Sequence, residues 1–381
     1  MSSILFVGLM NSDPWGGSEE LWYGQALYCA QNGHAVTCMV YYWPEKQAKL
    51  KALKNAGCSI IEIPNTGRRK KHFFQKIRYE FITKLQQQLF VRSQNVAQYN
   101  HVVVSQGAFM EVCNAPWKNF YKKLSSYVLI YHNYFPDFVF PPAKATLLKS
   151  WIKNAKNNFF DAGKIKTVLE KQLHITAIHG ITVYNPLTIP QQLHATPYPS
   201  IANEITMVVL AQLDVHRKAQ DNLIKALATN IWKERNFKLN LYGDGSDKAY
   251  LQQLINEYQL TDKVFLKGKT NTVDEVLKNS HIVLQLTHID AMPIAVIEAM
   301  CMSRPVITSN VGDMPLWVKN GINGWSSEAP TVVNITQVLE TAWQEKAKWE
   351  AMGKEAFNTY KLQFPNSVQE FFYSKAIQPY V

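Results

Sequence analysis

The sequence has no apolar run near the roughly eighteen residues that a membrane-spanning helix needs. Its first residues, MSSILFVGLM, lack the basic segment and small-residue cleavage site of a secretory signal, and they read better as a buried strand. Cysteines are few, and none stands in a C-x-x-C or metal-binding spacing. We therefore expect a cytoplasmic protein with buried, reduced thiols at Cys29, Cys38, Cys58, Cys113 and Cys301.

Acidic residues are scarce in the first half of the chain. Residues 1–200 contain 22 Lys and Arg against 10 Asp and Glu, a net charge of +12, whereas the rest contains 18 against 19. The densest basic stretch comprises Arg68, Arg69, Lys70, Lys71, Lys76, Arg78, Lys84 and Arg92. It alternates with an apolar set at helical spacing, namely Phe73, Phe74, Ile77, Phe81, Ile82 and Leu85. Such a helix either packs its apolar stripe on a sheet or lies on an anionic membrane surface.

The remaining composition is that of an ordinary globular protein, with 47% hydrophobic and 18% charged residues. A chain of 381 residues is long for one core and indicates two domains. Strand and helix patterns alternate, which predicts parallel sheets. We expect domains at 1–186 and 204–360, a proline-containing linker at 187–203, and a segment at 361–381 that crosses back to the first domain.

Within this framework, apolar strands are predicted at 4–8, 35–41, 59–63, 101–105, 127–131 and 181–184, with a helical segment at 142–160 before the last of them. The second domain is predicted to contain strands at 206–210, 238–242, 264–266, 282–286 and 305–308 and a helical tail at 336–360. In such sheets, ligands bind in the loops that follow the strands.

One stretch, HIVLQLTHIDAMPIAVIEAMCMSRPVITSNVG at 281–312, predicts a strand, a loop, a helix and a second strand. Asp290 lies in the loop, and Glu298 follows eight residues later inside the helix. The unpaired N–H groups and positive dipole of a helix start can bind a diphosphate, which leaves both acids for sugar hydroxyls. The alternative is that Asp290 caps the helix and Glu298 is a solvated helix residue.

Other polar positions follow predicted strands. Gly16 and Gly17 follow the first strand, and His132 directly follows the strand at 127–131. In the second domain, Arg217 and Lys218 precede a helix, where a cation suits a phosphate. Glycine turns at Gly243 and Gly268 end two further strands; taken alone, such turns are weak signals.

These patterns together resemble the retaining glycosyltransferases of family 4, or glycosyl transferases group 1. The Asp290 to Glu298 spacing resembles their E-x7-E signature with Asp as the first acid, and residues 16–40 resemble their GG-x-E opening. The resemblance implies an α/β protein of GT-B type, in which two Rossmann-like βαβ domains face each other across a cleft. It is carried mainly by residues 206–324.

The resemblance also implies roles for single residues. Glu298 would bind the nucleotide ribose, and Asp290 and His132 would face the donor sugar. Lys218 matches the family lysine that neutralises the diphosphate, and Arg217 is the candidate to replace the family arginine, because Gln212 stands at that position. Donor contacts are further expected at Gly16, Gly17, Gly243, Gly268 and the loop Ala291, Met292, Pro293 and Ile294, where Ala291 and Pro293 depart from the family pattern.

The resulting expectation is a retaining transferase that moves a sugar from a nucleotide diphosphate sugar to a glycan, lipid-linked or protein acceptor, in glycan or glycolipid assembly. No D-x-D motif follows a strand, so neither a metal nor another cofactor is expected. The basic half adds an anionic membrane surface as a possible partner on the inner face of the cell membrane. One alternative is a non-catalytic GT-B subunit that binds a glycan or a partner enzyme. Nucleic acid is not expected as a partner, because it would leave the second-domain motifs unexplained.

Overall fold

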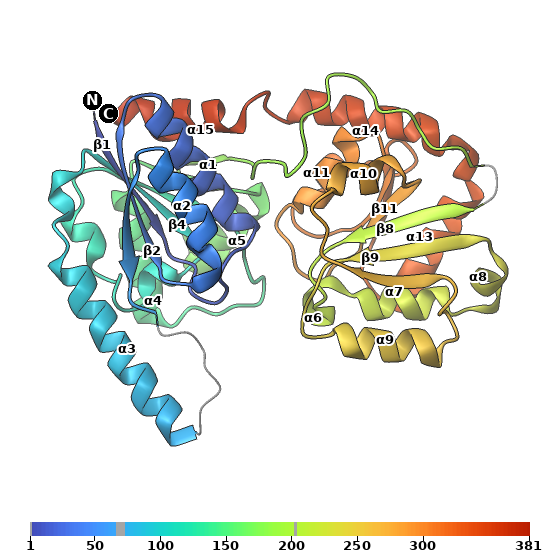
Figure 1. The fold of residues 1–381 in the computed structure, drawn as a ribbon, viewed down its shortest axis with the longest axis horizontal. Helices are drawn as coiled ribbons and strands as arrows, with labels where there is room; N and C mark the ends of the chain where they lie inside the picture. Colours follow the sequence, from blue (N-terminus) through green and yellow to red (C-terminus); the bar gives the residue numbers. More distant parts are fainter. Residues whose placement is uncertain (1, 66–72, 202–203) are drawn as a thin grey trace. The chain divides into compact units, whose positions relative to one another are not determined.

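The computed structural model describes residues 2–65, 73–201 and 204–381 (Figure 1). The chain forms two compact units: Met1–Pro186 together with Ser367–Val381, and Leu187–Asn366. Each unit contains a parallel sheet with helices packed against it. The α/β class with two parallel sheets that the sequence predicts is confirmed.

The sheet of the first unit has the strand order β3-β2-β1-β4-β5-β6-β7. Its strands are β1 Ser3–Gly8, β2 Ala35–Tyr41, β3 Ser59–Ile63, β4 His101–Gln106, β5 Tyr127–Tyr131, β6 Asn157–Phe160 and β7 Gly180–Thr182. The helices of this unit are α1 Gly17–Gln31, α2 Gln47–Asn55, α3 Phe73–Ser93, α4 Pro142–Asn154, α5 Gly163–Leu173 and α15 Val368–Ala376. The central strands are buried on both faces, as expected for a parallel sheet covered by helices.

The predicted helical segment at 142–160 is wrong over residues 155–160. Helix α4 ends at Asn154, the next residue is extended, and residues 157–160 form strand β6, which pairs in parallel with β5. Helix α5 then follows. The four residues of β6 are all buried and do not alternate with polar residues, so periodicity could not separate this strand from the end of a buried helix.

Helix α3 contains the described part of the basic segment. Arg68, Arg69, Lys70 and Lys71 lie outside the described residues, and side chains are described only from residue 81 onward. The helix turns Thr83 and Gln87 inward, and the Gln87 side-chain amide donates a hydrogen bond to the Pro64 carbonyl at 2.9 Å. Of the two alternatives, packing of the apolar stripe on the sheet therefore does not hold for this half of α3, whose exposed apolar side chains are Phe81, Ile82, Leu85 and Leu89.

The second unit has the strand order β10-β9-β8-β11-β12-β13. Its strands are β8 Ile205–Leu210, β9 Phe237–Tyr242, β10 Val264–Gly268, β11 Ile282–Gln285, β12 Val306–Ser309 and β13 Gly324–Ser327. Its helices are α6 Val215–Lys218, α7 Gln220–Leu227, α8 Asn230–Glu234, α9 Lys248–Glu257, α10 Val273–Lys278, α11 Ile294–Cys301, α12 Met314–Trp317, α13 Val332–Gln344 and α14 Trp349–Gln363. The predicted helical tail at 336–360 is thus two helices, separated by a turn at residues 345–348.

The C-terminal segment belongs to the first unit. Helix α15 packs against α1, as Figure 1 also shows, and the Tyr373 hydroxyl lies 2.8 Å from His34 Nε2. His101 Nε2 lies 2.8 Å from the Ala376 carbonyl oxygen, and burial lowers the His101 pKa to about 4. The chain leaves the second unit after Asn366, because α14 continues to Gln363 and packs on α11.

The linker expected at 187–203 is described as far as residue 201, and residues 202–203 lie outside the described residues. Residues 187–201 contain no helix or strand, but they are bound to the second unit. The Thr196 N–H donates to Ser303 Oγ at 2.9 Å, and the Tyr198 hydroxyl donates to the His281 carbonyl at 2.6 Å. Arg304 is fully buried and donates to the carbonyl oxygens of Pro197, Lys278, Leu277 and Ser303. Burial lowers the pKa of this guanidinium to about 10.

All five cysteines are buried and form no disulfide, as the sequence predicted. Within the three described ranges, no helix combines the length and the apolar character required to cross a membrane.

We predict that Arg304→Met destabilises the protein by at least about 2 kcal/mol, because buried carbonyl oxygens of two segments lose their donor. Urea unfolding followed by tryptophan fluorescence measures this change. The control is Lys278→Met, which alters an exposed side chain of α10 and should change the free energy of unfolding by less than about 0.5 kcal/mol. Equal stability of the two variants would contradict the role given to Arg304.

Candidate functional site

In the second unit, the loops that follow β8 and β11 are joined through one backbone carbonyl. The Arg217 carbonyl oxygen accepts hydrogen bonds from Thr287 Oγ1 at 2.5 Å and from the His288 N–H at 2.8 Å. The loops are thereby held together at the carboxyl edge of the sheet. Lys218 Nζ and Asp290 Oδ2 form an ion pair there, with both side chains largely buried. The structure therefore brings together two predicted site residues that are far apart in the sequence.

Arg217 lies beside this pair in sequence, but its guanidinium has other partners. Asp214 caps the short helix α6 and accepts from the Arg217 N–H and from Arg217 Nε, the latter at 2.7 Å. The Arg217 Nη2 donates to Gln212 Oε1, also at 2.7 Å. Burial alone would raise the Asp214 pKa, but the hydrogen bonds and charge of Arg217 prevail and hold it below its ordinary value. The guanidinium thus contacts Asp214 and Gln212.

The loop after Asp290 is held in a tight conformation. Asp290 Oδ1 accepts from the Ala291 N–H at 3.0 Å, and the Ala291 carbonyl accepts from the Asp313 N–H at 2.9 Å. Ala291 and Met292 are buried, and Pro293 precedes the first residue of α11, Ile294. Because Pro293 has no N–H, the donors at this helix start come from the residues around it.

Glu298 is 4% exposed, so it is not a solvated helix residue. Its Oε1 accepts from both the N–H and the hydroxyl of Thr188, each at 2.6 Å. Burial raises the pKa of Glu298, while the hydrogen bonds from Thr188 oppose that rise. Thr188 is the second residue of the second unit, so this carboxyl group holds the start of the unit.

The two glycine turns also lie next to each other. The Gly243 N–H donates to the Gly268 carbonyl at 2.9 Å. Gly243 has φ of 145°, and a Cβ there would overlap the Ala211 carbonyl oxygen, so only glycine fits between the two loops.

The first unit contains Gly16, Gly17 and His132. Gly16 is extended at the start of α1, and a Cβ there would meet its neighbours only at ordinary contact distances. His132 follows β5 and is buried; its Nε2 lies 3.2 Å from Ser105 Oγ, and its Nδ1 lies 3.4 Å from Asp161 Oδ2. The fold therefore places the predicted histidine at a strand end, within a polar cluster of its own unit.

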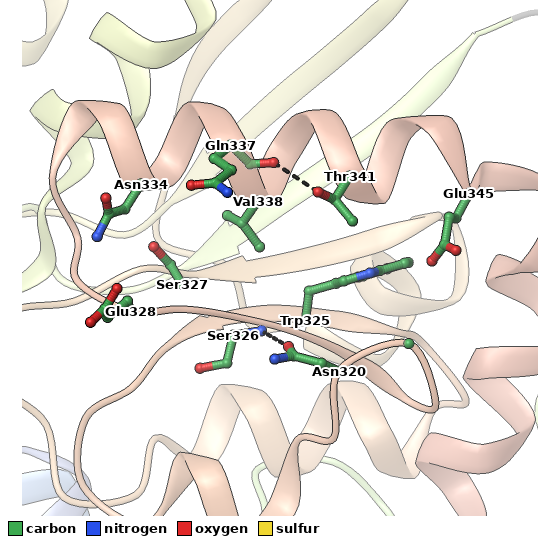
Figure 2. Close-up of a pocket in the computed structure, with 11 residues that line it drawn as sticks. Asn320, Trp325, Ser326, Ser327, Glu328, Asn334, Gln337, Val338, Thr341 and Glu345 are labelled. Atoms are coloured by element: carbon green, nitrogen blue, oxygen red, sulfur yellow. Dashed lines mark hydrogen bonds between the residues drawn. The ribbon is translucent and has the colours of Figure 1, made fainter.

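A separate cavity of about 480 Å³ lies between α13 and strand β13 with the residues that flank this strand (Figure 2). Among the described residues that line it are the polar side chains of Asn320, Ser326, Glu328, Asn334, Gln337 and Glu345. The lining includes no Lys, Arg or His, so it offers no side-chain cation to a diphosphate. Within the described part of the chain, the side chains of His, Cys, Asp and Glu also form no group that could hold a metal ion.

Sequence reasoning missed three polar residues next to the predicted site: Thr188, Ser105 and Asp161. Asp161 was hidden because the strand before it was assigned to a helix. Its signal was the apolar pair Phe159 and Phe160 followed by an acid, the pattern of a strand that ends at a ligand-binding edge. Thr188 gave no local signal, since only the fold brings it to Glu298.

Comparisons with known proteins find similar sequences over part of the chain. Residues 197–359 match the family model of glycosyl transferases group 1. The poly(glycerol-phosphate) alpha-glucosyltransferase of Bacillus subtilis is 20% identical over 60% of this chain and 34% of that protein. The poly(ribitol-phosphate) alpha-N-acetylglucosaminyltransferase of Staphylococcus aureus is 26% identical over 46% of this chain and 39% of that protein. The chain thus spans less than half the length of these curated relatives.

Solved structures resemble the chain over nearly its whole length. HepE of Anabaena, in complex with UDP and glucose, covers 98% of this chain with 99% of its own, at a TM-score of 0.72 and 16% identity. The sucrose-phosphate synthase of Thermosynechococcus elongatus covers 98% of both chains, at a TM-score of 0.74 and 14% identity. The fold is GT-B, as the sequence predicted.

We predict that Gly312→Ala disturbs the Asp290 loop. Gly312 has φ of 61°, and a Cβ there would overlap the carbonyl oxygens of Ala291 and Asp290. Gly321→Ala is a matched control, because Gly321 has φ of 73° but open space around the missing Cβ. Urea unfolding should show a loss of about 1 to 2 kcal/mol for the control and of roughly 3 kcal/mol or more for Gly312→Ala. Equal losses would mean that backbone strain alone explains both.

Proposed function

We propose that the protein is a retaining glycosyltransferase of GT-B type that moves a sugar from a nucleotide diphosphate sugar to an acceptor hydroxyl. The observation that carries this proposal is the pairing of Lys218 with Asp290 at the carboxyl edge of the second sheet, next to the start of α11. A cation and a helix start suit a diphosphate, and a carboxylate beside them suits sugar hydroxyls.

Lys218 is the group that stabilises the departing diphosphate. Its ammonium has three N–H donors, so a phosphate oxygen can bind while Asp290 keeps its contact. As the bond between the anomeric carbon and the diphosphate breaks, negative charge grows on the phosphate oxygens. A cation fixed beside them therefore acts more on the transition state than on the bound substrate.

Arg217 supplies the second positive charge. The family pattern has an arginine at the position of Gln212, and Gln212 Oε1 accepts from the Arg217 guanidinium. The positive charge of Arg217 therefore lies next to Gln212, which stands where the family has an arginine. This position supports the proposal that Arg217 replaces the family arginine. In this scheme the chain's own cations and backbone N–H groups neutralise the diphosphate, and no metal is assigned a step.

Glu298 binds the nucleotide ribose in this proposal. It accepts two hydrogen bonds from Thr188 at Oε1, and the remaining acceptor sites of the carboxyl group suit the hydroxyl donors of a ribose. Asp290, one loop away, faces the donor sugar and accepts from its hydroxyls. The acceptor oxygen bonds to the anomeric carbon on the face from which the diphosphate departs, and the hydroxyl proton passes to the departing phosphate oxygen. This attack retains the configuration and needs no protein nucleophile.

The test of this function is sugar transfer and donor hydrolysis by the full chain, with UDP, GDP and ADP donors. We predict that Lys218→Met lowers kcat by roughly 100-fold or more, because a fixed charge on the leaving group is lost. The matched control is Lys225→Met, which removes a lysine paired with Asp221 on the neighbouring helix α7 and should leave kcat within about twofold.

Wild-type protein that binds a nucleotide in a thermal-shift panel, yet neither transfers nor hydrolyses any donor, would favour a non-catalytic GT-B subunit. If it turns over a donor and Lys218→Met matches Lys225→Met, the lysine has no part in the reaction.

We also propose that the exposed side of α3 binds an anionic membrane surface. The enzyme would then act from the cytoplasm on a lipid-linked acceptor. Phe81, Leu85 and Leu89 recur at intervals of four residues on one helix face and are 70%, 48% and 58% exposed. Lys84 and Arg92 on the same helix are exposed, and the first half of the chain carries a net +12. Apolar side chains flanked by cations suit the boundary between acyl chains and anionic headgroups.

We predict that the protein sediments with phosphatidylglycerol vesicles at low salt, stays in solution with phosphatidylcholine vesicles, and is released as salt rises. The triple variant Phe81→Ser, Leu85→Ser and Leu89→Ser should lose most of this binding. The control is Leu362→Ser, which alters an apolar residue of α14 that is 87% exposed. A triple variant that sediments like the control would remove the membrane from the proposal.

A further inference from the structure

Four neighbouring strands of the first sheet contribute polar side chains to one buried cluster. Ser105 belongs to β4, His132 follows β5, Asp161 follows β6, and Asn185 lies three residues after β7. All four residues are less than a tenth exposed. The cluster lies at the carboxyl edge of the sheet, where parallel α/β sheets bind their ligands.

The contacts of the cluster give His132 a defined environment at each ring nitrogen. Nε2 lies 3.2 Å from Ser105 Oγ, and Nδ1 faces Asp161 Oδ2 at 3.4 Å without forming a hydrogen bond to it. The same carboxylate oxygen accepts from Asn185 Nδ2 at 3.3 Å. Because a carboxylate only accepts hydrogen bonds, the nitrogen that faces it is the favoured place for the proton of a neutral imidazole.

Other ionisable groups near the ring do not compete with Asp161. Glu19 and Glu111 interact with the charge of His132, and burial raises the pKa of both carboxyl groups. Glu19 is already paired with Lys46 Nζ at 3.2 Å, and Glu111 Oε1 accepts from the Ala108 N–H. Asp161 is therefore the carboxylate in contact with the imidazole.

We propose that Asp161 is a positioning residue that holds the proton of His132 on Nδ1, so that Nε2 is a hydrogen-bond acceptor. In this structure Nε2 then accepts from the Ser105 hydroxyl. The hydroxyl of a bound ligand, such as a sugar, can take the place of Ser105 at Nε2, whereas a phosphate oxygen or a ring oxygen cannot, because it has no proton to give. The inference rests on the proposed function only in taking a sugar as that ligand.

The test is the tautomer of His132, measured by long-range ¹H–¹⁵N NMR on the full chain labelled with ¹⁵N-histidine. The His132 signals are those that disappear in His132→Gln. Wild type should show a protonated Nδ1 and a bare Nε2, Ser105→Ala should keep that pattern, and Asp161→Ala should shift the proton toward Nε2. The wild-type spectrum is decisive without any variant, so a failure of Asp161→Ala to fold leaves the test intact.

A wild-type His132 protonated at Nε2 would overturn the proposal, as would an Asp161→Ala spectrum identical to wild type. Because the spectrum is recorded without substrate, this result does not depend on whether the protein transfers a sugar. If it does, Asp161→Ala should lower kcat by roughly 10- to 100-fold through loss of orientation. The variant Asn185→Ala, which removes the donor that contacts the same oxygen at 3.3 Å, should keep the proton on Nδ1. Loss of the Nδ1 proton in this variant would assign the role to the cluster as a whole and overturn the role of Asp161.

Discussion

The candidate site of the second unit depends on the Arg217 carbonyl. By accepting from Thr287 Oγ1 and the His288 N–H, it joins two loops that lie seventy residues apart. The Lys218 side chain leaves the backbone at the next residue, and Asp290 lies two residues beyond His288. A flexible lysine side chain loses rotamer entropy when it pairs with a carboxylate. Because the two loops are held together, Lys218 and Asp290 are already close, and the pair forms with less reorganisation of the backbone. A backbone contact thereby sets the geometry of the charges.

The acids of the site differ in how the fold uses them. Asp290 is partly accessible and tied to a cation, whereas Glu298 is almost fully buried and tied to neutral donors of Thr188. The negative charge of Asp290 is therefore balanced by Lys218, whereas burial disfavours a negative charge on Glu298 and raises the pKa of Glu298. In the proposed reaction, Asp290 therefore suits a place next to the developing charges, and Glu298 suits the binding of a neutral ribose.

The sequence predicted the elements and residues whose signals are local. Lys218, Asp290 and Glu298 have local signals, because Asp290 lies in the loop after a predicted strand, Lys218 precedes a predicted helix and Glu298 lies inside one. Asp161 could not, because four buried residues without alternation read as helix. Periodicity also could not predict which face of α3 packs against the rest of the unit. A spacing of four residues defines an apolar stripe, but the inward side is the one on which Gln87 donates a hydrogen bond to Pro64. Long-range partners such as Thr188 need the folded chain.

The proline-containing stretch 187–201 has a consequence for the engineering of this chain. Its composition suggests a spacer whose length is free, yet Thr188, Thr196, Pro197 and Tyr198 are each bound to residues of the second unit. Residues added here would have to bulge away from fixed anchor points, so they would disturb the packing of α11 and β11 before they lengthened any tether. A tag or reporter domain should therefore be inserted at an exposed turn elsewhere, and not in the segment that looks most permissive.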